Sequence, residues 1–149
     1  DLPVNINMPN KVFVDSSAWI AYFVPTQPDH LGFKKLFSQL ITNHAFFHTS
    51  NDIIDESYTR LRYDLGYHVA NKFIINTKKS LLNKSLIQLW TDENIQFEAF
   101  NLLDKYQDHD LSLTDATTAI LMKRFQINSI LTLDFKHFTT LGFEVYPQR

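Results

Sequence analysis

The sequence predicts an α/β fold built on a mainly parallel sheet. Short apolar runs alternate with longer segments in which apolar residues recur at helical spacing. This alternation is typical of βαβ units, whose strands run parallel. Two of the apolar runs also end in an aspartate, and ligands of parallel sheets bind beyond the carboxyl ends of the strands.

Five apolar runs are expected to form strands. They are residues 12–14, 45–49, 85–90, 129–134 and 143–147. The first run leads directly into Asp15, and the fourth ends at Asp134. Both carboxylates are therefore predicted at the carboxyl edge of the sheet.

Helices are expected between these strands, from the spacing of apolar residues and from capping signals. They are residues 17–23, a segment starting near Asp29, and residues 50–66, 67–84, 93–107 and 112–125. The last begins with a Ser-x-x-Asp capping box, and Gly66 is a typical helix end.

Length and composition limit the class of protein. With 149 residues the chain is expected to form one domain, residues 1–149, and 44% hydrophobic residues suffice for a sizeable core. It has no cysteine, and its six histidines show no zinc-site spacing. The net charge of −2 gives no general attraction for nucleic acid.

Targeting signals are missing from the sequence. No apolar run approaches the length of a membrane span, and "DLPVNINMPN" at the N-terminus lacks the basic-then-apolar pattern of a signal peptide. A cytoplasmic location is the expectation.

Four acidic residues are predicted to converge at the carboxyl edge of the sheet. Besides the two strand-end aspartates, Glu56 and Asp115 lie in the first turns of helices that follow parallel strands, and such helices start at the same edge. Carboxylates this close would repel one another unless a cation lay between them. Hard oxygen ligands suit Mg²⁺ or Mn²⁺, which can activate water for phosphodiester hydrolysis.

Each acid also has a simpler structural interpretation. Asp15 can cap the helix at 17–23, and Asp115 is a favourable anion at a helix N-terminus. Glu56 can lie on a solvated helix face, and Asp134 can be a turn residue. His137, three residues past Asp134, has two interpretations: it can face the site, or it can be a loop or surface residue, and the second is favoured.

Three blocks of the sequence resemble a known family. "VFVDSSAWIAYF" resembles the opening of a PIN-domain ribonuclease, and "SNDIIDESYTRLR" resembles its second block, a helix with a metal-site glutamate. "YQDHDLSLTDATTAILMKRFQINSILTLDFKHF" closely resembles the third block, and "LGFEVYP" the usual ending. The resemblance spans Val12 to Pro147.

The resemblance implies a three-layer α/β/α sandwich with a parallel sheet of four to five strands, and Mg²⁺- or Mn²⁺-dependent cleavage of RNA. It assigns the metal and catalytic roles to four acidic residues, Asp15, Glu56, Asp115 and Asp134. Ser16 and Thr114 are expected to supply hydroxyls that orient the carboxylates. Arg60, one helical turn past Glu56, is a candidate contact for phosphate or for an antitoxin carboxylate.

A single domain of this size also resembles the VapC toxins of VapBC toxin–antitoxin pairs. Such toxins are usually homodimers that a VapB-like antitoxin inhibits. Most aromatic residues lie on apolar stripes, so we interpret them as core or dimer interface. Tyr22 and Tyr63 are better candidates for stacking on RNA bases.

Other functions remain open at this point. A PIN-fold protein can have a housekeeping role in RNA processing or act as a non-catalytic scaffold, and similar metal chemistry can cleave DNA. A response-regulator receiver is disfavoured, because it needs paired acids after the first strand and an acid at the end of the third, where "LIQLW" has none.

Overall fold

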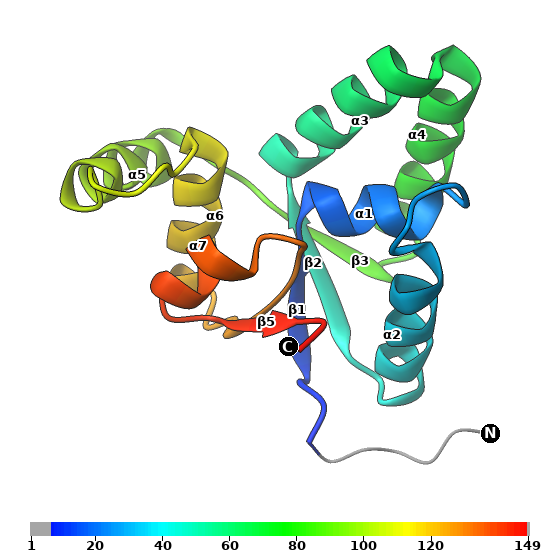
Figure 1. Cartoon of the computed structure of the whole chain (residues 1–149), viewed down its shortest axis with the longest axis horizontal. Coiled ribbons are helices and arrows are strands. Elements are labelled where there is room, and N and C mark those ends of the chain that lie inside the picture. The colour runs from blue at the N-terminus through cyan, green and yellow to red at the C-terminus, as the bar shows by residue number, and fades with distance from the viewer. Residues whose placement is uncertain (1–6, 149) are drawn as a thin grey trace.

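A five-stranded, wholly parallel sheet forms the centre of the computed structural model, which describes residues 7–148 (Figure 1). The strands are β1 (Lys11–Val14), β2 (Phe46–Ser50), β3 (Leu86–Leu89), β4 (Ser129–Leu131) and β5 (Glu144–Tyr146). Their order across the sheet is β3-β2-β1-β4-β5. All five predicted strands are present, although the fourth ends at Leu131 rather than at residue 134.

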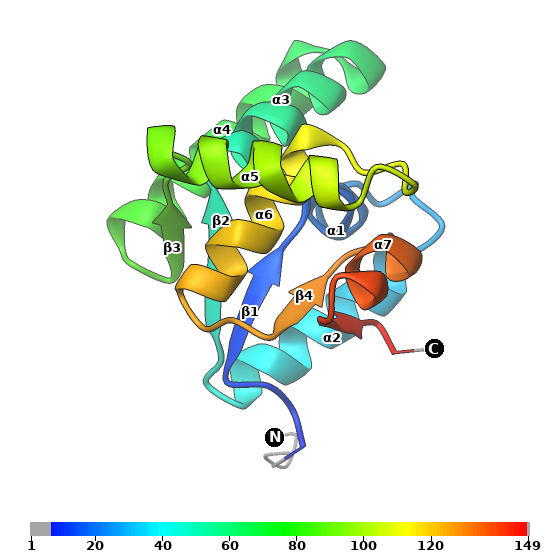
Figure 2. The ribbon, with the colours of Figure 1, turned by 90° about the vertical axis from the view of Figure 1, so that its left-hand side faces the viewer.

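Within residues 7–148, seven helices connect and cover the strands. They are α1 (Ser16–Phe23), α2 (His30–Thr42), α3 (Asn51–Leu65), α4 (Tyr67–Leu82), α5 (Glu93–Lys105), α6 (Leu113–Arg124) and α7 (Phe135–Thr140). Figure 2 shows α5 and α6 crossing in front of the sheet, with α2 behind it. Helices therefore lie on both faces of the sheet, as the predicted three-layer sandwich requires.

Alternation along β1 explains the two hydrophobic cores. Phe13 packs into a cluster with residues of α5, α6 and α7, whereas Val12 and Val14 pack with residues of α1 and α2 on the other face. All three side chains are fully buried. A strand buried on both faces reads as a continuous apolar run, which is why this segment was recognisable in the sequence.

Helix α7 was not predicted. Asp134 caps it by accepting a hydrogen bond from the backbone N–H of His137 at 3.1 Å, and Phe138 is its buried anchor. Six residues are too few for helical periodicity to be visible. The interpretation of His137 as a loop or surface residue is therefore wrong, because it lies half-buried in the first turn of a helix.

The order in which successive strands are added to the sheet reverses beside β1. β2 and β3 extend the sheet on one side of β1, and β4 and β5 extend it on the other. Parallel α/β sheets bind ligands at such a reversal, beyond the carboxyl ends of the strands. In this sheet that position lies between Val14 and Leu131, which are paired in register.

Among residues 7–148, no helix combines the length and the hydropathy that a membrane crossing requires. Most of the N-terminal segment that was assessed for a signal peptide, residues 1–6, lies outside the described residues.

Candidate active site

The four predicted acids lie at the carboxyl edge of the sheet, beside the reversal. Asp15 follows β1 and caps α1, and Asp134 lies three residues beyond β4 and caps α7. Glu56 is in the second turn of α3, and Asp115 is in the first turn of α6. Two strand ends and two helix starts therefore position the set.

Electrostatic coupling connects the four carboxylates. The charges of Glu56 and Asp115 each raise the pKa of Asp15, and the charge of Asp134 raises the pKa of Asp115. Groups influence each other in this way only over short distances inside a protein. The structure therefore brings together all four acids, which are 41, 59 and 19 residues apart in the sequence.

Asp15 is the most buried of the four, with 8% of its surface exposed. Burial is the main reason why its pKa rises to about 6. Hydrogen bonds from the Thr132 hydroxyl at 2.7 Å and from the Ser16 backbone N–H at 2.8 Å oppose that rise. Asp15 is thus a destabilised anion that a nearby positive charge would stabilise.

Asp115 combines a structural role with an unfavourable charge. Its side chain accepts the backbone N–H of Ser112 at 3.1 Å, and the Ser112 hydroxyl accepts the backbone N–H of Asp115 at 3.0 Å, which completes the predicted capping box. Burial raises the pKa of Asp115 most strongly. The hydrogen bonds with Ser112 lower that pKa, and the charge of Asp134 raises it further. One carboxylate therefore starts α6 and also faces the acidic set.

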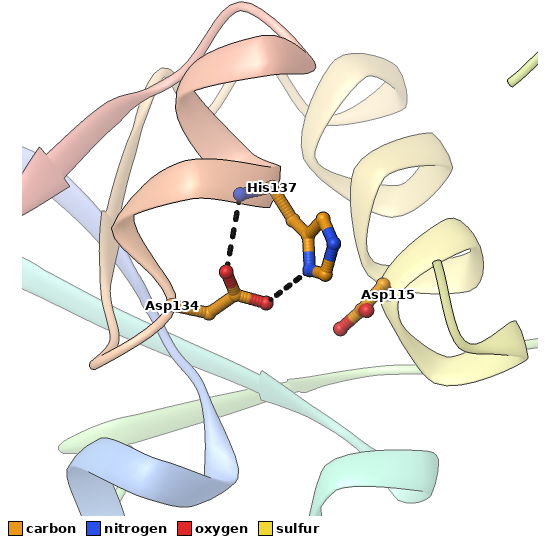
Figure 3. Close-up of side chains that lie close together, drawn as sticks. All are labelled: Asp115, Asp134 and His137. Carbon is orange, nitrogen blue, oxygen red and sulfur yellow. Dashed lines mark hydrogen bonds and ion pairs between the residues drawn. The ribbon is translucent and has the colours of Figure 1, made fainter. Parts of the chain in front are cut away.

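Asp115, Asp134 and His137 form the tightest group of candidate ligands (Figure 3). One donor atom from each lies within 4.8 Å of the other two. His137 Nδ1 is 2.7 Å from Asp134 Oδ2, so the ring and the carboxylate are held against each other. The sequence contained a weak signal for this histidine: an i, i+3 spacing from Asp134, which brings side chains together once α7 forms.

Thr132 links two of the acids. Its hydroxyl donates to Asp15 and also accepts the backbone N–H of Asp134 at 3.0 Å. Because the single hydroxyl proton of Thr132 goes to a carboxylate, Ser17, whose oxygen is 3.2 Å away, must donate to Thr132. Ser17 in turn accepts the backbone N–H of Leu133 at 2.9 Å, so the loop after β4 is bonded to the start of α1.

These two hydroxyls were not among the predicted residues. Ser16 meets Asp15 through its backbone N–H, and Thr114 contributes its carbonyl oxygen, 3.1 Å from the Thr117 hydroxyl. The orienting roles given to the Ser16 and Thr114 hydroxyls remain predictions. A signal for Thr132 was its position two residues before Asp134, near the end of a predicted strand.

A second link joins the two acidic helices. The Thr117 hydroxyl of α6 lies 3.0 Å from Asp52 Oδ2, in the first turn of α3. This contact fixes the start of α3, which carries Glu56, against the start of α6, which carries Asp115.

Arg60 is exposed on α3, one turn beyond Glu56. Within the described part of the chain it forms no ion pair. Its charge is therefore available to a binding partner.

The donor set fits a hard divalent cation. Clustered carboxylates, of which Asp15 and Asp115 have raised pKa values, match the oxygen ligands that Mg²⁺ and Mn²⁺ prefer, and a cation would relieve their mutual repulsion. The fold and this site define a class: an α/β protein with an acidic edge suited to a cation, where the strand order of a parallel sheet reverses.

The comparison with protein families identifies the class more closely. The family model for the PIN domain matches residues 12–143, and the chain belongs to this family. The family resemblance expected from the sequence is thereby confirmed.

Three relatives illustrate the similarity. The chain is 28% identical over 134 residues to ribonuclease VapC26 of Mycobacterium tuberculosis, covering 87% of this chain and 91% of that protein. It superposes with a TM-score of 0.78 on VapC20 of the same organism, described as a toxin that cleaves the sarcin–ricin loop, at 23% identity over 89% of this chain and 95% of that one. FitAcB from Neisseria gonorrhoeae superposes with a TM-score of 0.62 at 16% identity, over 90% and 95% of the two chains.

Proposed function

We propose that this chain is a Mg²⁺- or Mn²⁺-dependent endoribonuclease that hydrolyses phosphodiester bonds of RNA. The observation that carries the proposal is the electrostatic coupling of four carboxylates at the carboxyl edge of the sheet. The similarity to a protein named ribonuclease VapC26 supports RNA as the substrate. An RNA-cleaving toxin of the same fold supports it further.

Asp15 and Asp115 are the main metal ligands in this proposal. Burial and mutual repulsion make both carboxylates poor anions without a cation, so their ligand role would offset the cost of ionising them. Asp134 completes the ligand set, directly or through water. His137 holds the Asp134 carboxylate from one side, while the backbone N–H of His137 holds it from the other.

Glu56 is given a different task. Glu56 is half-buried and lies on a different helix from the other three acids. Its charge raises the pKa of Asp15. It binds the metal directly or through water and orients the attacking water toward the phosphate. A bound divalent cation would supply Lewis-acid polarisation of the phosphoryl oxygen and a lower pKa for water.

Thr132 and Ser17 act as positioning residues. The hydroxyl bond from Thr132 holds Asp15 in one rotamer and favours its ionised form, which is the form that binds a cation. The same hydroxyl accepts the Asp134 backbone N–H, so one side chain sets the separation of two ligands.

The toxin half of a toxin–antitoxin pair is the role that fits this activity best. Two similarities support it: one to VapC26 and one to VapC20, the latter described as a toxin. The proposal includes a VapB-like antitoxin as inhibitor, a homodimer as the assembly, one nuclease domain over residues 1–149, and the cytoplasm as the location.

Cleavage of end-labelled RNA tests the proposal. Purified protein should fragment a single-stranded RNA and a hairpin RNA in Mg²⁺ or Mn²⁺, and excess chelator should stop the reaction until metal is restored. A DNA strand of the same sequence tests the choice of sugar. Folded protein that leaves both RNAs intact in both metals would favour the non-catalytic scaffold role instead.

A further inference from the structure

The outward face of α3 carries an unusual row of side chains. Tyr63 has 84% of its surface exposed, and Arg60 is exposed one turn before it. Leu61, about 160° from Tyr63 around the helix, is buried on the opposite side. An aromatic ring this exposed contributes little to the stability of the fold, so its position calls for another explanation.

The helix itself fixes the direction of this row. At 3.6 residues per turn, Asp52, Glu56 and Tyr63 fall within an arc of about 40°. Asp52 contacts Thr117 of α6, and the charge of Glu56 acts on Asp15, so this arc faces the acidic site at its inner end. Tyr63 is on the same line, about 10 Å farther along the axis. Figure 1 shows α3 and α4 projecting together beyond the carboxyl ends of β1 and β2.

Cations accompany the aromatic residues at the outer end of α3. Arg62 stacks over the ring of Tyr67, with 6.0 Å between the guanidinium carbon and the ring centroid, and Tyr67 is itself more than half exposed. Arg60 lies between Glu56 and Tyr63 and forms no ion pair within residues 7–148, although Asp64 is four residues away. Basic side chains beside exposed aromatic rings are a composition that binds single-stranded nucleic acid without reading its sequence.

We propose that this face of α3 is the track on which single-stranded RNA beside the cleavage point lies. Arg60 contacts a backbone phosphate, and Tyr63 stacks on a base within about three nucleotides of the cut, because about 10 Å spans about three base steps of 3.4 Å. The inference rests on the proposed nuclease function and adds to it the preference for a single-stranded flank. At the outer end of the row, Arg60 and Tyr63 offer a cation and a stacking ring to RNA, whereas the acids Asp52 and Glu56 lie at the inner end, where the proposed metal would offset their charge.

Binding in excess chelator separates this inference from catalysis, because the proposed chemistry then stops. A fluorescein-labelled single-stranded RNA of mixed sequence is the probe, and a blunt hairpin without single-stranded flanks is its comparison. Tyr63→Ala should weaken binding of the single strand about five-fold or more, whereas Tyr63→Phe should retain it, since stacking needs only the ring. Binding of the blunt hairpin should change little.

Two further measurements assign the separate roles. Arg60→Ala should reduce the slope of log K against log salt by about 0.7, the value for one phosphate on a single strand, and Tyr63→Ala should leave the slope unchanged. An RNA with one base removed near the cut should bind wild type more weakly. The Tyr63→Ala variant should bind the abasic RNA as tightly as it binds the intact RNA, because the variant no longer has the ring on which that base would stack.

Matched controls lie at the other end of the strands or on another helix. Phe46→Ala removes an aromatic ring that is 60% exposed at the start of β2, and Lys35→Ala removes an exposed cation of α2. Neither should alter RNA binding. In the presence of metal, Tyr63→Ala should raise KM with little change in kcat.

Unchanged RNA affinity in Tyr63→Ala would overturn the inference. Loss of self-association in that variant, with unchanged RNA affinity, would instead assign the face to contact between copies of the chain. The proposed function fails by a different result, namely no metal-dependent cleavage by wild-type protein, whatever the binding data show.

Discussion

The Thr132 hydroxyl donates a 2.7 Å hydrogen bond to Oδ2 of Asp15, across 117 residues of sequence. The hydroxyl oxygen of Thr132 also accepts the backbone N–H of Asp134. A single buried side chain therefore sets the positions of two acids that come from different strands. The first prediction tests this arrangement.

Thr132→Val should weaken Mg²⁺ or Mn²⁺ binding by about 10- to 100-fold, as is typical when a partner of a metal ligand is lost. The variant leaves the Asp134 N–H and the Ser17 hydroxyl proton without an acceptor, which should destabilise the fold by about 1–3 kcal/mol. Thr132→Ser should retain most of the metal affinity. Calorimetric titration with each metal gives the comparison.

Thr118→Val is the matched control for that substitution. Its hydroxyl is also buried, but it has no hydrogen-bond partner among the described residues. Removing it should leave the metal affinity as in wild type. Equal metal affinities in Thr132→Val and wild type would refute the positioning role.

Asp115→Asn should reduce RNA cleavage to the level measured with chelator, because it neutralises a carboxylate at the centre of the acidic set. Asp110→Asn removes the same charge from the exposed loop before α6 and should cleave normally. Circular dichroism must show that both variants are folded. Comparable turnover by Asp115→Asn and wild type would remove Asp115 from the catalytic assignment.

Metal-free protein should become less stable as the pH rises from about 4 to about 7. The pKa of Asp15 is about 6 in the folded chain and 3.8 as its ordinary value, so ionising it costs more in the folded state than in the unfolded state. The stability that protonated Asp15 contributes is fully present below pH 3.8 and is lost as the pH rises through about 6. That loss is of the order of 3 kcal/mol, and the raised pKa of Asp115 acts in the same direction.

Urea unfolding in chelator, with wild type and Asp15→Asn side by side, measures this effect. The difference in unfolding free energy between the two proteins should move in favour of Asp15→Asn as the pH rises, because the variant has no charge to bury. A difference that stays constant from pH 4 to pH 7 would mean that Asp15 ionises normally in the fold.

Divalent metal should reverse the instability at neutral pH. A cation that binds only the native state stabilises it by about 2.7 kcal/mol at a concentration 100 times Kd. Mg²⁺ and Mn²⁺ should therefore raise the Tm of wild type at pH 7 more than that of Asp15→Asn. Equal shifts in both proteins would place the metal elsewhere.

Production of the chain in bacteria should slow growth, and production of Asp115→Asn should not, since toxicity in this proposal comes from RNA cleavage. Growth curves at equal levels of soluble protein provide the measurement. Equal growth with an active nuclease would favour a housekeeping role in RNA processing.

The parts of the site that the sequence revealed are those that depend on local structure. Asp15 was predictable because a strand buried on both faces is a continuous apolar run, and its last residue marks the sheet edge. Asp115 was predictable because a capping box marks the start of α6. The end of β1 and the start of α6 are therefore both visible in the sequence itself.

The parts that it did not reveal depend on which strands become neighbours. Thr132 reaches Asp15 only because β4 pairs with β1, and nothing in the local sequence specifies that pairing. α7 is too short to show a periodic pattern, so the spacing of His137 from Asp134 was not enough to favour its inward position over a surface one. Contacts between distant segments carry the geometry that local patterns lack.

The strand order has a consequence for synthesis of the protein. Ribosomes add about 5–20 residues per second, and β1 and β2 leave them long before β4 does. Until β4 and the loop after it have left the ribosome, Asp15 lacks its contact with Thr132, and Asp134 cannot join the site. A chain whose synthesis stops before β4 therefore lacks two contributors to the proposed nuclease site, so the proposed RNA cleavage requires residues up to at least Asp134.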